Sequence, residues 1–152
     1  DAQEKELSHL LAQAITPAVR LNLYPKSTID VYITVVQSDG WWSTLAGAIT
    51  CASAALVDAG IDMLDLVTAT SAVVADGHIL ADPTCSEESH PSVQGTVLVA
   101  GLSSLREVTH VVQTGSLALD ITTQATNNCI ETCGQLHDVV GQCLKSSLVA
   151  CE

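Results

Sequence analysis

Residues 64–75 read LDLVTATSAVVA and are followed by Asp76-Gly77 and by HILA at 78–81. The first run combines β-branched Val and Thr with small Ala and carries a single charge, a composition that is typical of a buried strand. Asp-Gly is a favoured pair for a tight hairpin turn, because both residues tolerate the backbone angles that the turn requires. The pattern therefore predicts a strand over 64–75 that pairs back with 78–81.

Further strands are predicted on both sides of this hairpin. Residues 28–36, TIDVYITVV, alternate apolar with polar or aromatic side chains, the period-two pattern of a half-buried strand that closes at Ser38-Asp39-Gly40. Residues 94–102 and 108–114 are two β-prone runs joined by a polar segment. They predict a second antiparallel hairpin.

Helical patterns precede, separate and follow these strands. Apolar residues at three-and-four spacing predict a first helix that Pro17 kinks or ends, and they are Leu7, Leu10, Leu11, Ala14 and Ile15. Residues 43–59 are rich in small residues and end at Gly60, and residues 120–150 predict a long terminal helix. The order of elements predicts the α+β class, as one domain over 1–152 with helices covering one face of a mixed sheet.

Composition excludes several classes of protein. The chain has 152 residues, 47% of them apolar, yet charged and polar residues interrupt every stretch that could cross a membrane. Seventeen acidic residues against five basic ones give a net charge of −12, which repels a phosphate backbone and disfavours autonomous nucleic-acid binding. The absence of Phe leaves no extended stacking platform for single strands.

The cysteines favour a reducing compartment over a disulfide framework. The apolar fraction is large enough to stabilise a core without covalent links, and several cysteines fall within helical patterns. The chain has six cysteines: Cys51, Cys85, Cys129, Cys133, Cys143 and Cys151. One group, Cys129, Cys133 and His137, has the four-residue steps of one helical face. A structural zinc site needs four ligands from more than one local element, so no metal is expected there.

Several ordered blocks resemble the ribonuclease PH family, and most of all the exosome ring subunits within it. They are LNLYPKSTIDV at 21–31, VQSDG at 36–40, LVDAGI at 56–61 with Met63 and Asp65 after it, Asp76-Gly77, LAD at 80–82 and Glu87-Glu88. A chance match of several blocks in the same order is much less frequent than a match of one short motif. The resemblance implies a ribonuclease PH-type domain that is N-terminally incomplete, because family members have an additional N-terminal part with β-strands and basic RNA-contacting residues.

Active family members cleave RNA 3′ ends with phosphate, and the resemblance implies a cradle for that phosphate after the 28–36 strand. The family sequence there is usually Asp-Gly-Gly-Thr-Arg, whereas this chain has Asp39, Gly40, Trp41, Trp42 and Ser43. Replacing the second glycine by Trp41 and the arginine by Ser43 removes a close backbone approach and a bidentate cationic donor. Phosphate binding is therefore not expected at this position.

Active relatives also carry two acidic positions for metal binding and acid catalysis, which by spacing correspond to Glu88 and Gln94. An amide at Gln94 supplies neither a negative charge for a divalent ion nor an acidic proton. Alternatively, Glu87 and Glu88 form a solvated acidic turn. No catalytic residue and no cofactor are expected, and the Trp41-Trp42 pair suits either core packing or an exposed partner surface.

The resemblance implies a non-catalytic ring subunit of the RNA exosome, working in 3′-to-5′ RNA processing and degradation. Its partners would be other ribonuclease PH-like ring subunits, cap subunits and RNA that passes through the assembled channel, with no membrane. Its location would be the nucleus, nucleolus and cytoplasm. Two alternatives stay open at this point: an active phosphorolytic exoribonuclease, and a stand-alone protein-binding module.

Overall fold

The computed structural model describes residues 2–150, and Cys151 lies outside them. Three long helices, one short helix, two 3-10 turns and the strands follow one another along the chain. In order they are α1 (Ala2–Ile15), η1 (Thr16–Ala18), η2 (Leu21–Leu23), α2 (Trp41–Asp58), β1 (Val67–Ala75), β2 (His78–Ala81), α3 (Cys85–Glu88), β3 (Val93–Leu102), β4 (Glu107–Gly115) and α4 (Leu119–Ala150). None of the helices in this range is both long and apolar enough to cross a bilayer.

The sheet has four strands in the order β2-β1-β3-β4, and every neighbouring pair is antiparallel. The α+β class and the two predicted hairpins are confirmed, with β1 pairing back to β2 and β3 to β4. The prediction of a mixed sheet is wrong, because no two neighbouring strands are parallel: β2 and β3, which run in the same direction, are separated by β1, and the connection through α3 crosses over that strand.

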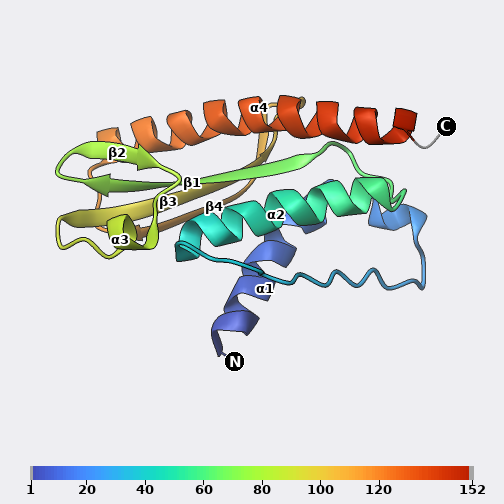
Figure 1. Cartoon of the computed structure of the whole chain (residues 1–152), viewed down its shortest axis with the longest axis horizontal. Coiled ribbons are helices and arrows are strands. Elements are labelled where there is room, and N and C mark those ends of the chain that lie inside the picture. The colour runs from blue at the N-terminus through green and yellow to red at the C-terminus, as the bar shows by residue number, and fades with distance from the viewer. Residues whose placement is uncertain (1, 151–152) are drawn as a thin grey trace.

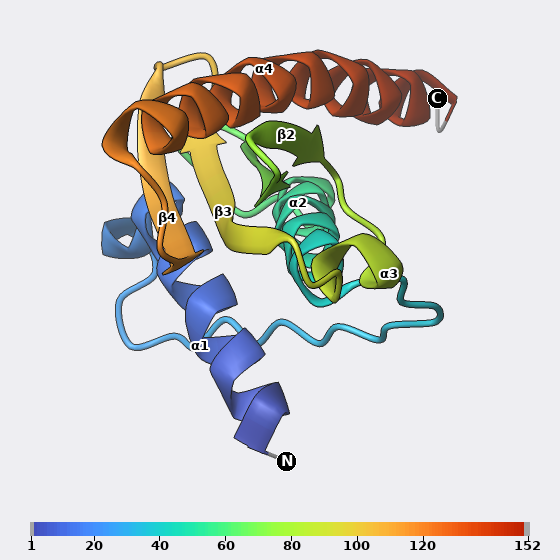
Figure 2. The same ribbon diagram turned by 90° about the vertical axis from the view of Figure 1, so that its left-hand side faces the viewer.

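Helices cover both faces of the sheet, and the prediction of one covered face is also wrong. Figure 1 shows α4 along one side of the sheet and α1 with α2 on the other, and Figure 2 shows the same layers from the end. Successive residues of β1 point to opposite faces. Val67 and Ala69 belong to the core under α1 and α2, whereas Ala72 and Val74 pack with Ala125 of α4. The central strands therefore need apolar or internally bonded side chains on both faces.

Hydroxyl groups satisfy the polar atoms at the buried start of β1. Strand β3 runs beside all of β1, but β2 pairs only with its second half, so the earlier residues have no strand on the side away from β3. Ser53 Oγ of α2 accepts a hydrogen bond from Val67 N at 2.8 Å, and Thr50 Oγ1 accepts one from Ala69 N at 3.1 Å. Helix α2 thereby covers the open part of this sheet edge.

On the other face, two threonines of β1 bond to α4. Thr68 Oγ1 donates to the carbonyl of Cys133, and Thr70 Oγ1 donates to that of Cys129, each at 3.0 Å. Each hydroxyl is thus buried with a partner, which avoids the cost of an unpaired buried donor. The threonines in the otherwise apolar β1 run fix the position of α4 on the sheet.

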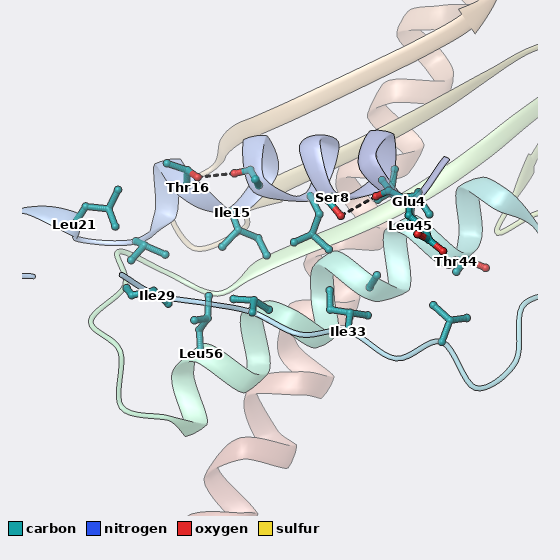
Figure 3. Close-up of a pocket in the computed structure, with 17 residues that line it drawn as sticks. Glu4, Ser8, Ile15, Thr16, Leu21, Ile29, Ile33, Thr44, Leu45 and Leu56 are labelled. Atoms are coloured by element: carbon teal, nitrogen blue, oxygen red, sulfur yellow. Dashed lines mark hydrogen bonds between the residues drawn. The ribbon is translucent and has the colours of Figure 1, made fainter. Parts of the chain in front are cut away.

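Residues 28–36 do not form a strand, contrary to the prediction. Their side chains alternate as expected: Ile29, Val31, Ile33 and Val35 line a pocket of about 450 Å³ together with residues of α1 and α2. Figure 3 shows Ile29 and Ile33 on the segment that runs beside these helices, facing Ile15, Leu45 and Leu56. The chain is extended but pairs with no other strand among the described residues, so the period-two pattern identified the side that lines the pocket without implying a ladder, and Val31, Ile33 and Val35 remain exposed.

Asp65 ties the start of β1 to the β3–β4 turn and to α4. Its carboxylate accepts hydrogen bonds from Leu66 N at 2.8 Å, Ser104 N at 2.9 Å, Ser104 Oγ at 3.1 Å and His137 Nε2 at 3.0 Å. Burial alone would raise the pKa of Asp65, but the hydrogen bond from His137 and those from the two amides hold it below its ordinary value. The fold therefore stabilises the ionised form of the Asp65 carboxylate.

We expect Asp65→Asn to lower the free energy of unfolding at neutral pH by about 1–3 kcal/mol, because the amide cannot accept all of these bonds and loses the charge that strengthens them. Because folding lowers the pKa of Asp65, its charge contributes fully to the free energy of unfolding above the pKa that Asp65 has in the unfolded chain. This contribution is lost as the pH falls through the lower pKa of the folded state. Urea unfolding at a series of pH values should therefore show the two proteins converging in acid.

Asp30→Asn is the matched control, since Asp30 is exposed and makes no hydrogen bond within the described residues. This control should unfold like the natural chain at every pH. A deficit of Asp65→Asn that stays constant down to strongly acidic pH would contradict the role assigned to the charge.

Candidate functional site

The residues matched to the phosphate cradle lie at the start of α2, beside the loop that leads into α3. Gly40 is the N-cap residue of α2, with φ +129°. A Cβ at this position would lie 2.6 Å from Ser43 Oγ, 2.9 Å from Glu88 Oε1 and 2.9 Å from the carbonyl oxygen of Pro83. Both the backbone angle and the crowding require glycine here. The helix start, the loop and α3 are consequently in direct contact.

Glu88 caps α2 from a distant part of the sequence. Its Oε2 accepts a hydrogen bond from Trp41 N at 2.7 Å, and its Oε1 accepts one from Trp42 N at 3.0 Å. The first amides of a helix have no partner within the helix, and the positive end of the helix dipole lies there as well. A half-buried carboxylate from the last residue of α3 therefore takes the place where an external anion would bind.

Ser43 and Asp39 complete the contacts between α2 and the α3 loop. Ser43 Oγ lies within hydrogen-bonding distance of two carbonyl oxygens, that of Pro83 at 3.1 Å and that of Asp39 at 3.4 Å. Asp39 Oδ1 accepts a bond from Cys85 N at 3.4 Å. The hydroxyl at the position of the family arginine thus points to carbonyl groups of its own chain and serves the packing of the loop.

The two tryptophans are both partly buried, and they differ in what they touch. Trp42 packs against the core formed by α1, α2 and the sheet. Trp41 belongs to neither of the two core clusters. Core packing thus describes Trp42, whereas Trp41 is partly exposed at the helix start without contributing to either core cluster.

Glu87 and Gln94 have other surroundings than Glu88. Glu87 closes a capping box with Thr84, accepting bonds from Thr84 N and Thr84 Oγ1 at 2.8 Å each. The Thr84 amide and hydroxyl hold the pKa of Glu87 below its ordinary value. Gln94 is exposed at the start of β3, and no hydrogen bond joins its side chain to Glu88 in the described part of the chain. Both glutamates therefore accept hydrogen bonds at helix starts, Glu88 at α2 and Glu87 at α3, and Glu87 does so while exposed to solvent.

Taken together, the structure gathers Asp39, Gly40, Trp41, Ser43 and Glu88 into one contact group, and Gln94 makes no hydrogen bond to it. Within residues 2–150, no Lys or Arg side chain takes part in the hydrogen bonds of this group. The role of Pro83 was missed in the sequence, because a backbone carbonyl leaves no compositional signal. The group can bind its own carboxylate, but it presents no cation to a phosphate.

The second candidate group, Cys129, Cys133 and His137, does not form a ligand set. Both cysteines are buried under the sheet, and burial raises the pKa of each thiol, which disfavours the thiolate that a metal requires. His137 Nε2 is instead hydrogen-bonded to Asp65 and Ser104. In the described residues, no group of three or more His, Cys, Asp or Glu side chains is arranged to hold a metal ion.

Comparison with known proteins supports the family resemblance that the ordered sequence blocks indicated. The 3′ exoribonuclease family, domain 1, matches residues 1–62. The chain is 38% identical over 144 residues to the exosome complex component mtr3 of Schizosaccharomyces pombe, covering 93% of this chain and 56% of that protein. It is 34% identical over 146 residues to the exosome complex component RRP41-like of Arabidopsis thaliana, covering 96% and 56%, respectively.

An archaeal protein and a solved structure extend these matches. The exosome complex component Rrp41 of Pyrobaculum calidifontis is 34% identical over 148 residues, with 97% of this chain and 58% of that protein covered. The crystal structure of rice Rrp46 superposes with a TM-score of 0.84 at 24% identity, covering 95% of this chain and 66% of that one, which shows a shared fold. The chain spans little more than half the length of the relatives that it matches. By sequence and fold, it belongs to the ribonuclease PH family, as a homologue of exosome core subunits.

Proposed function

We propose that this chain is a ring subunit of the RNA exosome that supports 3′-to-5′ RNA processing and degradation without performing phosphorolysis itself. The names of its relatives support the exosome role, since the proteins that match over nearly the whole chain are exosome components. The observation that carries the non-catalytic part is the carboxylate of Glu88 on the first amides of α2.

Phosphorolysis depends on holding an inorganic phosphate and neutralising its charge while it attacks the RNA 3′ end. At the start of α2, two amides that could bind a phosphate are already bonded to Glu88. A phosphate placed there would have to displace a carboxylate of its own sign. It would also meet Ser43 where active relatives have an arginine, so the displacement gains no cation in return.

The neighbouring groups make anion binding still less favourable. The carboxylates of Asp39 and Glu87 lie in the same contact region, bonded to Cys85 N and to Thr84. Both carboxylates are exposed, so solvent and salt screen part of their repulsion of an incoming anion, and they add only modestly to the effect of Glu88. The site therefore favours an internal carboxylate over a dianion from solution, and the same charges disfavour RNA binding by this face.

A ring subunit without chemistry of its own acts through its neighbours. The proposed partners are other ribonuclease PH-like ring subunits and the cap subunits, with RNA passing through the assembled channel. The proposed locations are the nucleus, the nucleolus and the cytoplasm, and neither a cofactor nor a metal is assigned. The whole chain 1–152 is proposed to act as one domain.

The catalytic part is tested with purified chain, Mg²⁺, inorganic phosphate and single-stranded RNA carrying a 5′ label. We expect no shortening of the RNA and no release of nucleoside diphosphates. The double variant Ser43→Arg/Gln94→Asp should remain inactive, because Trp41 and the Glu88 carboxylate still occupy the helix start. Release of nucleoside diphosphates by the natural chain would support an active phosphorolytic exoribonuclease and exclude the proposal.

The assembly part is tested by native mass spectrometry after purification of the tagged chain from its own cells. We expect recovery in a complex with other ribonuclease PH-like subunits, because the exosome components that it resembles are parts of such an assembly by name. A variant of the site, Glu88→Gln, should be recovered in the same complex. Recovery of a stable monomer without any RNA-processing partner would instead support a stand-alone binding module.

A further inference from the structure

We propose that Asp65, Ser104 and His137 form a three-ligand site for a divalent transition-metal ion of the Zn²⁺ type, which joins α4 to the start of β1 and to the β3–β4 turn. The site is separate from the start of α2, and it does not depend on whether the chain belongs to an exosome ring. Three observations carry the inference: the distances between the ligand atoms, the number of protons available to them, and the groups that orient them.

The three ligand atoms form a nearly equilateral triangle. His137 Nε2 lies 3.0 Å from Asp65 Oδ1, and Ser104 Oγ lies 3.1 Å from that same oxygen and 3.2 Å from His137 Nε2. Ligand atoms that each bind Zn²⁺ at roughly 2.1 Å are separated by about 3.0 Å in octahedral geometry and by about 3.4 Å in tetrahedral geometry. The triangle therefore has the size of one face of such a coordination sphere.

Too few protons are present to make all three contacts hydrogen bonds. The Ser104 hydroxyl has one proton and His137 Nε2 has at most one, whereas an ionised carboxylate has none. Burial would raise the pKa of Asp65, but its hydrogen bonds, chiefly the one from His137, hold that pKa below its ordinary value, so the carboxylate is ionised at neutral pH. At most two protons thus serve three contacts, whereas a metal ion above the triangle would bind all three lone pairs at once.

Neighbouring groups orient the ligands. Leu66 N donates to Asp65 Oδ1 at 2.8 Å, and Ser104 N donates to Asp65 Oδ2 at 2.9 Å. The other ring nitrogen of His137, Nδ1, lies 3.7 Å from Asp138 Oδ1. Histidines that bind a metal commonly direct their second N–H to a carboxylate, which fixes the tautomer that leaves the first nitrogen free. When the metal binds, a neutral imidazole moves its proton from Nε2 to Nδ1, next to Asp138, and a protonated imidazole loses the Nε2 proton to solvent.

The ligands come from three parts of the fold. Asp65 precedes β1, Ser104 lies in the β3–β4 turn and His137 belongs to α4. Figure 2 shows this turn reaching α4. The side chains of Asp65 and His137 are 11% and 21% exposed, so water can reach the remaining coordination positions. An imidazole among the ligands favours a metal of the Zn²⁺ type over Mg²⁺, which prefers oxygen ligands.

The probe is ZnCl₂, titrated by calorimetry into the full chain after treatment with a chelator. Thiols also bind zinc, so the protein carries serine at every cysteine except the buried Cys129 and Cys133. These substitutions are Cys51→Ser, Cys85→Ser, Cys143→Ser and Cys151→Ser. We expect one saturable site per chain, with an affinity that falls as the pH is lowered because protons compete for His137. MgCl₂ should not compete with zinc.

Three variants of this protein locate the site. His137→Gln removes the imidazole and should lower the zinc affinity by about tenfold or more, and Asp138→Asn should lower it by about tenfold through the orientation of His137. Asp138 is 81% exposed, so its substitution leaves the fold intact and decides the matter even if His137→Gln fails to fold. His78→Gln is the matched control at an exposed position of β2, and its zinc affinity should be unchanged.

Thermal unfolding gives a second readout, because a ligand that binds only the folded chain raises its Tm. Zinc should raise the Tm of the control and of the parent protein more than that of Asp138→Asn. No binding by the parent protein would overturn the proposal and leave three hydrogen-bonded groups. Equal zinc affinity of Asp138→Asn and the control would show adventitious binding only. None of these readouts depends on RNA or on other exosome subunits, so the proposed function can fail while this proposal stands, and the reverse.

Discussion

The amides of Val67 and Ala69 at the start of β1 have to be hydrogen-bonded on the side away from β3, where no strand lies beside them. Ser53 and Thr50 of α2 accept those bonds from Val67 and Ala69, and they fix how α2 lies against the sheet. The orientation of α2 then determines where its first turn points, which is toward Pro83 and α3. The candidate site thus owes its position to two hydroxyl groups more than a helical turn away from it.

Within that frame, the start of α2 behaves as an anion site that the protein fills by itself. Glu88 supplies the charge, Gly40 supplies the space, and Ser43 secures the loop between them. In the family pattern the same helix start receives a phosphate with help from an arginine. Here the same helix start binds the Glu88 carboxylate and so holds α3 on α2. The position that binds phosphate in the family pattern thus contributes to the stability of the fold.

The sequence predicted the helices and the two hairpins because their signals are local: apolar spacing, Asp76-Gly77, and two β-prone runs around a polar turn. It failed for residues 28–36, for the mixed sheet and for the number of covered faces. Alternation reports which side of a segment is buried, but pairing and layering depend on groups far away in the chain. The capping role of Glu88 could not be predicted for the same reason. Sequence spacing identified the residue, but it did not show that its carboxylate accepts hydrogen bonds from the first amides of α2.

The cap has a consequence for the order of folding. Glu88 lies 46 and 47 positions after the amides that it accepts from, and β1 and β2 are formed by the intervening chain. The first turn of α2 can therefore be completed only after this hairpin and α3 have docked, whereas the second half of the helix binds β1 directly. Closing such a long loop carries an entropic cost that local contacts do not have. The first turn of α2 is thus expected to become ordered later than the second half of the helix.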